Sequence, residues 1–329
     1  MAVRLGSSGL RWDAAKAPPP LAGFIDVVLR GVGQVMFQNN AYAGLLFVAG
    51  IFYSAPQLAW ATLAGSAISS ATAVLLGAER SQLRAGLYGF NGALVAIGVL
   101  LFLQPGAWVW VCAALAAATS TVVMAALTNL LGRWKIPALT APFIFCTLAV
   151  LLARLRLGRL QPSDALPPAA LPQAAAADGA LSASTLVEGL FNGIGQVFFQ
   201  GNLVTGLLFV AGLLIASRSA CAAGLTGSLV GLLAAWAMGA AEPALRAGLY
   251  GFNSVLVAIA LATVFLAGDG AAVLYALAAS VVAVLVTAAL SAAFEPFGLP
   301  ALTLPFVLVT WTFLFAANQF ARLRQPPEH

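Results

Sequence analysis

The chain has 329 residues, of which 62% are hydrophobic and 8% are charged, and it carries a formal net charge of +5. Soluble domains contain about 45–50% apolar and about 25% charged residues, so this composition excludes an ordinary soluble protein and indicates one that lies in a lipid bilayer. The positive charge does not indicate nucleic acid as a partner, because the arginines lie mainly at the ends of apolar runs, where topology signals occur.

The first predicted element is an amphipathic helix. We expect residues 1–20 to form a disordered tail without a cleaved signal, since they contain no apolar core of signal-peptide length. The segment 24–38 then places four polar side chains at four-residue steps, namely Asp26, Arg30, Gln34 and Gln38. This spacing puts them along one helix face. The segment is too polar and too short to face lipid, so we predict a re-entrant half-helix that is buried in protein or lines a wet cavity.

Five apolar runs follow, near or above the roughly 18 residues that a membrane span needs. They cover residues 43–55, 58–76, 86–103, 107–131 and 139–152. Residues 157–182 are rich in Pro and Ala and predict a linker. A second amphipathic element carries Glu188, Asn192, Gln196 and Gln200 at the same four-residue steps. Five more apolar runs cover residues 203–216, 221–238, 248–266, 271–293 and 302–320, before a C-terminal tail at 322–329.

Three motifs occur twice in the same order, which indicates a duplicated unit. GQVMFQNN at 33–40 returns as GQVFFQGN at 195–202, RAGLYGFN at 84–91 returns unchanged at 246–253, and IPALTAPF at 136–143 returns as LPALTLPF at 299–306. We therefore predict two membrane repeats, residues 21–156 and 183–321. Five crossings per repeat would invert the second copy, but would place Arg154, Arg156 and Arg159 outside. Six crossings would correct this cluster but place Arg80, Arg84, Arg133 and Lys135 outside, so the polarity of the short helix is the better argument for five. The predicted fold is an all-α integral membrane protein of two inverted repeats, each with five transmembrane helices and one re-entrant half-helix.

Inverted repeats that each contribute a half-helix place a site near the bilayer midplane at their interface. The repeated motifs supply the candidates for lining a pore. In the first repeat they are Gln34, Val35, Phe37, Phe90, Leu94 and Thr140, and in the second Gln196, Val197, Phe199, Phe252, Leu256 and Thr303. Glutamines can instead seal helix contacts in lipid, and phenylalanines can pack against lipid or a neighbouring helix. Duplication of the polar stripe at one offset favours a lined path.

The two threonines stand between prolines, in PALTAP and PALTLP. Proline frees backbone carbonyls in the preceding turn of a helix. We therefore expect Thr140 and Thr303 each to lie beside unpaired carbonyls, forming a short row of hydrogen-bond acceptors. Such a row is costly in hydrocarbon unless water or a solute satisfies it.

Several kinds of chemistry have no candidate residues. The single histidine is His329, the three cysteines lack metal-ligand spacing, and there is no phosphate-binding loop, so we expect no metal and no cofactor. The long runs carry essentially no charge, which favours passive movement of a neutral solute. Paired phenyl rings and rows of acceptors suit a small planar amide.

Three alternatives remain open at this point. The path could carry ammonia or another small neutral solute, although it has no buried histidine. A coupled transporter would need Asp26 and Glu188 as its ion site, whereas carboxylates at helix starts usually stabilise the helix dipole. An intramembrane enzyme would need a nucleophile beside a base, and the polar residues here offer amides and hydroxyls only.

The three duplicated motifs resemble those of the urea transporters, and the resemblance covers the chain from about Gly23 to Phe320. It implies a passive urea channel in each protomer of a homotrimer in the cell (inner) membrane, with ten spans and two re-entrant helices. It also implies a selectivity filter with two urea sites, separated by a constriction at Thr140 and Thr303.

The same resemblance assigns roles to the motif residues. It implies that Gln34 and Gln196 receive the urea amides, with Phe37 and Phe199 nearby. The flat walls would be Phe90 with Leu94 and Phe252 with Leu256, adjoined by Val35 and Val197. Some relatives place a carboxylate where this chain has the neutral Gln196, so the strength of that site would differ here.

Overall fold

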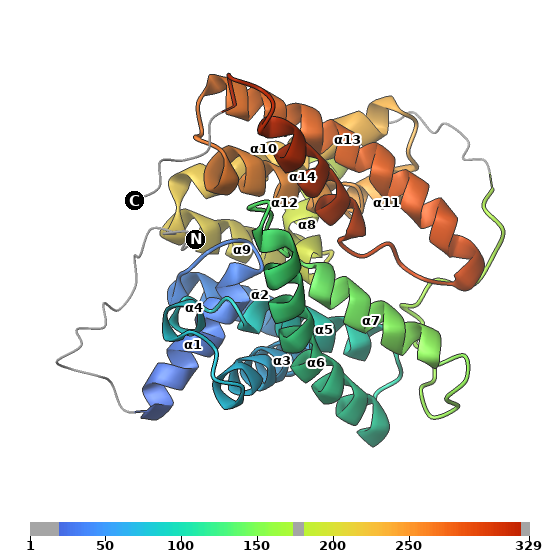
Figure 1. Ribbon diagram of the computed structural model, residues 1–329. Helices are drawn as coiled ribbons and strands as arrows, with labels where there is room; N and C mark the ends of the chain where they lie inside the picture. Colours follow the sequence, from blue (N-terminus) through green and yellow to red (C-terminus); the bar gives the residue numbers. More distant parts are fainter. Residues whose placement is uncertain (1–19, 174–180, 324–329) are drawn as a thin grey trace. The chain divides into compact units, whose positions relative to one another are not determined.

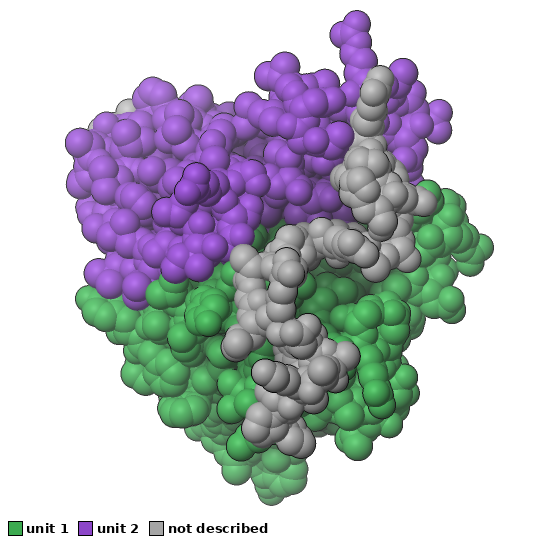
Figure 2. Space-filling view, turned by 90° about the vertical axis from the view of Figure 1, so that its left-hand side faces the viewer, with its two compact units in different colours: residues 1–166 green, residues 167–329 purple. Residues whose placement is uncertain are grey.

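The computed structural model describes residues 20–173 and 181–323, which form α-helices joined by turns (Figure 1). The tails predicted at 1–20 and 322–329 lie outside the described residues, apart from Pro20, Arg322 and Leu323. The chain divides into two compact units, unit 1 (Met1–Leu166) and unit 2 (Pro167–His329) (Figure 2). The division falls inside the segment 157–182 that the sequence predicted as a linker.

Unit 1 contains seven α-helices in its described residues. They are α1 (Pro20–Gln34), α2 (Ala41–Ser54), α3 (Pro56–Leu75), α4 (Arg80–Arg84), α5 (Gly89–Phe102), α6 (Ala107–Gly132) and α7 (Ala141–Ala153). The start of α2 is fixed by Asn40, whose side chain accepts hydrogen bonds from the backbone N–H groups of Tyr42 and Ala43. Helix α3 packs along α5, and α1 packs against α2. The buried helix α5 is therefore the centre of this unit.

Unit 2 repeats this order of elements. Its described helices are α8 (Ala183–Gly195), α9 (Leu203–Ala216), α10 (Arg218–Ala237), α11 (Glu242–Arg246), α12 (Gly251–Ile259), α13 (Gly270–Phe294) and α14 (Leu304–Ala317). A 3₁₀ turn (Gln196–Phe198) follows α8, a π-helix (Ala260–Phe265) extends α12, and a second 3₁₀ turn (Glu295–Phe297) follows α13. Helix α10 packs along α12 as α3 does along α5. Each unit thus places its copies of the three motifs on corresponding elements.

Five segments of the described chain are long and apolar enough to cross a membrane. They are Pro56–Leu75, Ala107–Gly132, Arg218–Ala237, Glu242–Phe265 and Gly270–Phe297. The helix pair Ala183–Phe198 and Leu203–Ala216 would be a sixth if counted as one span, but its two parts are bent by 73°. The structure is thus that of an all-α, multi-pass membrane protein; five spans per repeat and their inversion stay predictions.

Four further apolar helices, α2, α5, α7 and α14, have only 13 or 14 residues. At 1.5 Å per residue they extend about 20 Å, less than the roughly 30 Å of a hydrocarbon core. Four of the runs predicted as spans begin with residues that precede the helix itself: α5 begins at Gly89, α7 at Ala141, α12 at Gly251 and α14 at Leu304. The missing length is occupied by the motif residues, which form turns before these helices.

The amphipathic elements end earlier than predicted. Helix α1 stops at Gln34 and α8 at Gly195, so Gln38 and Gln200 lie beyond them rather than on the same helix face. In each case the chain turns at a phenylalanine with left-handed backbone, Phe37 (φ 62°) or Phe199 (φ 60°). A non-glycine residue in this region ends a helix, because the left-handed conformation cannot continue a right-handed one.

Candidate functional site

In unit 1 the first motif touches the second. Gln34, at the end of α1, is buried, and its Nε2 donates a hydrogen bond to the backbone oxygen of Ala85 at 2.7 Å. The next residue, Gly86, has φ 75°, and a Cβ added to it would lie 2.5 Å from the backbone nitrogen of Gly31. Only glycine allows this turn and this close approach of two backbones. The RAGLYGFN segment therefore passes directly against the end of α1.

Unit 2 reproduces this contact. The Nε2 of Gln196 donates to the backbone oxygen of Ala247 at 2.9 Å, and Gly248 has φ 75° with a would-be Cβ 2.3 Å from the nitrogen of Gly193. No hydrogen bond to the Oε1 of Gln34 or of Gln196 occurs among residues 20–173 and 181–323. The amide nitrogens thus hold a contact inside each unit, while the amide oxygens can still accept a hydrogen bond.

The second motif holds the third through an asparagine. In unit 1 the Oδ1 of Asn91 accepts the N–H of Phe143 at 3.0 Å, and its Nδ2 donates to the backbone oxygen of Leu139 at 3.2 Å. These two bonds fix the backbone on both sides of Thr140. In unit 2 the Oδ1 of Asn253 accepts the N–H of Phe306 at 3.2 Å, but its Nδ2 donates to Thr287 on α13 instead.

Thr140 and Thr303 lie where α7 and α14 begin, and each is only 3% exposed. The expected row of unpaired carbonyls is wrong for unit 1. The oxygens of Ala138, Leu139 and Thr140 accept hydrogen bonds from Ala141 N–H, Asn91 Nδ2 and Ile144 N–H. The reason is that Pro142 lies in the first turn of α7, where a missing N–H breaks no helical bond.

The apolar candidates fall into two matching groups. Phe90 and Leu94 lie one turn apart on α5, as Phe252 and Leu256 do on α12, so each pair shares a helix face. Phe252 is half-buried, whereas the other three side chains are buried. Val35 and Val197 are buried in the turns that follow α1 and α8, and Phe37 and Phe199 in the same turns are half-buried. The two units thus place their apolar candidates on corresponding helices and turns.

The two carboxylates do not stabilise helix starts. No acidic residue lies in the first turn of α1 or α8, and the side chain of Ser182 caps α8 by accepting the N–H of Thr185 at 3.1 Å. Asp26 forms an ion pair with Arg30 of its own helix at 2.6 Å, and Glu188 contacts Arg246 of α11 at 3.4 Å. The prediction of helix capping by Asp26 and Glu188 was therefore wrong.

Sequence reasoning missed several contributors to the site. The backbone oxygens of Ala85 and Ala247 carry no side-chain signature, and only their place in a duplicated motif could have pointed to them. Asn91 and Asn253 were visible as the last letter of that motif, but their partners were not. Among the described residues, no three His, Cys, Asp or Glu side chains gather as a metal site requires.

The urea transporter family matches this chain over residues 25–318. "Urea transporter 1" of Ovis aries and that of Rattus norvegicus are each 32% identical to it over 315 residues, which cover 95% of this chain and 82% of the relative. "Urea transporter 1" of Mus musculus is 31% identical over the same length. The match includes all six copies of the repeated motifs, and the chain belongs to the urea transporter family.

Proposed function

We propose that this protein carries urea passively across a membrane, through a pore within each protomer. The observation that carries the proposal is membership of the urea transporter family over residues 25–318. The relatives that share 31–32% of its residues are urea transporters by name. The duplicated amide, phenyl and hydroxyl groups of the two units are chemically suited to urea. Transport, rather than catalysis, is the role that this family indicates.

We further propose that each repeat supplies one set of lining residues and that together they form a selectivity filter with two urea sites. The sets are Gln34, Val35, Phe37, Phe90, Leu94 and Thr140, and Gln196, Val197, Phe199, Phe252, Leu256 and Thr303. Urea is flat and has four N–H donors, so ring faces fit its plane while amide and hydroxyl oxygens replace the water that it loses. This support is chemical: a neutral donor needs acceptors, not charges.

The proposal includes an assembly and a location. We infer a homotrimer in the cell (inner) membrane, with two inverted repeats of five spans and one re-entrant helix each. The 73° bend between Ala183–Phe198 and Leu203–Ala216 supports the re-entrant element in the second repeat. A path for ammonia or another small neutral solute is less well supported, because the family and its named relatives indicate urea.

Stopped-flow light scattering on proteoliposomes tests the function directly. With urea, formamide and glycerol as solutes, we expect saturable urea flux that does not change when a proton or sodium gradient is imposed. The expectation follows because Asp26 and Glu188, the two carboxylates that a coupling ion would need, each form an ion pair with an arginine. Strong dependence on either gradient would replace passive transport with coupled transport.

Thr303→Val is expected to slow urea flux about tenfold. Valine keeps the shape of threonine but removes the hydroxyl, so urea crossing this position loses a partner worth about 1–3 kcal/mol in a dry site. Cys221→Ala is the matched control, since Cys221 is also buried in unit 2 but belongs to no repeated motif. The measurement is urea flux per reconstituted protein. Equal rates for the two variants would contradict the assignment of Thr303 to the path.

A further inference from the structure

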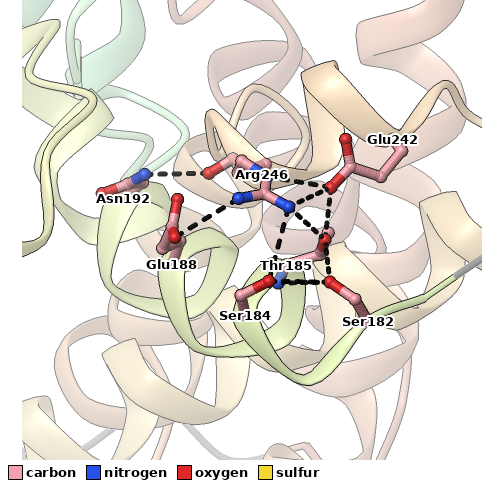
Figure 3. Close-up of polar contacts among 7 residues, drawn as sticks. All are labelled: Ser182, Ser184, Thr185, Glu188, Asn192, Glu242 and Arg246. Atoms are coloured by element: carbon pink, nitrogen blue, oxygen red, sulfur yellow. Dashed lines mark hydrogen bonds and ion pairs between the residues drawn. The ribbon is translucent and has the colours of Figure 1, made fainter.

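Arg246, the last residue of α11, is the centre of a polar cluster in unit 2 (Figure 3). Its guanidinium contacts Glu242 at 2.8 Å, Glu188 at 3.4 Å and Thr185 at 3.3 Å. It also reaches the hydroxyl of Ser184 at 3.4 Å, and Thr185 donates to the same Glu242 oxygen. Since Ser184, Thr185 and Glu188 belong to α8, this cluster ties α11 to α8.

The backbone after Arg246 continues the same connection. The carbonyl of Arg246 accepts a hydrogen bond from Asn192 Nδ2 at 2.8 Å, and the next carbonyl, of Ala247, accepts Gln196 Nε2 at 2.9 Å. Glu188, Asn192 and Gln196 lie at successive turns of α8 and its extension. Side chains on three successive turns therefore hold the segment Arg246–Ala247. Glu188 does so through its charge, and Asn192 and Gln196 do so through their amides.

The carboxylate of unit 1 that corresponds to Glu188 has a different partner. Asp26 stands where unit 2 has Glu188, but it pairs with Arg30 of its own helix, and both side chains are less than 10% exposed. Arg30 in turn donates to the backbone oxygen of Asn39 at 3.0 Å and to its side-chain oxygen at 2.9 Å. In unit 1 Arg30 thus holds the turn after α1; the equivalent residue of unit 2 is Asn192, which donates to the Arg246 carbonyl.

We propose that Arg246 is a positioning residue for urea selection: through its contacts with α8 it holds the Ala247 carbonyl that orients the Gln196 amide. This inference rests on the proposed function, because it concerns the same urea path. The Ala247 oxygen takes the amide nitrogen of Gln196, which directs the amide oxygen away from that contact. When the amide oxygen of Gln196 faces the solute, it accepts hydrogen bonds from N–H donors. An amide turned by 180° would present its own NH₂ group, which cannot accept them.

The cluster is suited to positioning rather than to stability. The side chains of Arg246, Glu188 and Glu242 are 41%, 37% and 27% exposed. Ion pairs with this much access to water add little to folding free energy. Removing the guanidinium should therefore leave a folded protein while loosening the segment that carries Ala247. The expected loss is in discrimination between solutes.

The test compares urea with acetamide, which is flat and has the same number of heavy atoms but half as many N–H donors. Both fluxes are measured by stopped-flow light scattering on proteoliposomes of the full-length protein. For Arg246→Gln we expect the urea-to-acetamide flux ratio to fall about fivefold, the factor that one ordinary hydrogen bond contributes. Arg246→Lys, which keeps the charge, should restore part of the ratio. Glu188→Gln, which weakens one contact only, should lower the ratio less.

Arg218→Gln is the matched control, because Arg218 is an exposed arginine of the same unit at the start of α10. The urea-to-acetamide flux ratio of the Arg218→Gln variant should equal that of the unmodified protein. If Arg246→Gln lowers both fluxes equally, or lowers only the melting temperature, the residue is merely structural and the inference is overturned. If Arg246→Gln does not fold, an unchanged ratio in both Arg246→Lys and Glu188→Gln overturns it as well. Failure of the unmodified protein to carry urea would instead overturn the proposed function.

Discussion

Gly86→Ala is expected to remove most of the folded protein. Gly86 has φ 75°, and an added Cβ would meet the backbone nitrogen of Gly31 at 2.5 Å and the backbone carbon of Arg30 at 2.6 Å. Those atoms belong to the interior of α1 and cannot move aside as a flexible side chain can. We expect the free energy of unfolding to fall by more than about 4 kcal/mol, in the range that marks a severe packing defect.

Gly77 provides the matched control for this substitution. It lies in the same unit with the same φ of 75°, but a Cβ there would find nothing within 4 Å. Gly77→Ala therefore carries only the backbone strain of a left-handed residue, about 1–2 kcal/mol. The measurement is the fraction of monodisperse protein that survives a heating series in detergent. Similar losses for the two variants would show that backbone strain, and not the contact between α1 and RAGLYGFN, makes Gly86 necessary.

Hydrophobicity and repetition predicted the helical membrane fold and the positions of most helices. The predicted run 107–131 agrees with α6 (Ala107–Gly132) to within one residue. The agreement is expected, because a continuous apolar segment can satisfy its backbone hydrogen bonds in lipid only by forming a helix. The predicted helix boundaries were wrong where residues of a repeated motif form the turn before a helix. Run 139–152 looked continuous, but Leu139 has φ 52°, so α7 starts at Ala141. Nothing in the letters Ala-Leu-Thr indicates a left-handed leucine.

The same limit applies to the amphipathic elements. A spacing of four residues predicted one helix face through Gln38 and Gln200, whereas the helices end before these residues. Periodicity describes a helix only as long as the backbone remains helical, and a left-handed Phe37 or Phe199 has no sequence signal of its own. Gln38 and Gln200 instead donate to backbone oxygens in the turns, at 2.6 and 2.8 Å.

The candidate residues could be chosen from the sequence because they were duplicated, but their contacts could not. Gln34 and Ala85 are 51 residues apart, as Gln196 and Ala247 are, and a backbone carbonyl has the same chemistry in every residue. The charges show the same limit. Asp26 and Glu188 occupy equivalent positions, yet one pairs within its helix and the other with α11. Which partner a carboxylate meets depends on tertiary packing, which a local pattern does not encode.

Asn91→Ala is expected to cost about 2–5 kcal/mol of folding free energy and to lower urea flux per folded protein. The substitution leaves the N–H of Phe143 and one acceptor site of Leu139 without their partner at a position that is 1% exposed. A buried backbone group that loses its hydrogen bond costs about 1–3 kcal/mol. Because these two groups flank Thr140, the loss also releases the backbone that places the threonine hydroxyl.

Two comparison variants separate the contributions to this effect. Asn91→Asp keeps an oxygen for the N–H of Phe143 but cannot donate to Leu139 when ionised, so it should be nearly as damaging. Asn129→Ala removes an exposed asparagine of α6 in the same unit and should change melting temperature and flux little. Melting temperature in detergent and stopped-flow urea flux measure the two effects. If Asn91→Ala had the same melting temperature as the unmodified protein and carried urea equally fast, the second motif would not hold the third. The position of Thr140 would then depend on packing alone.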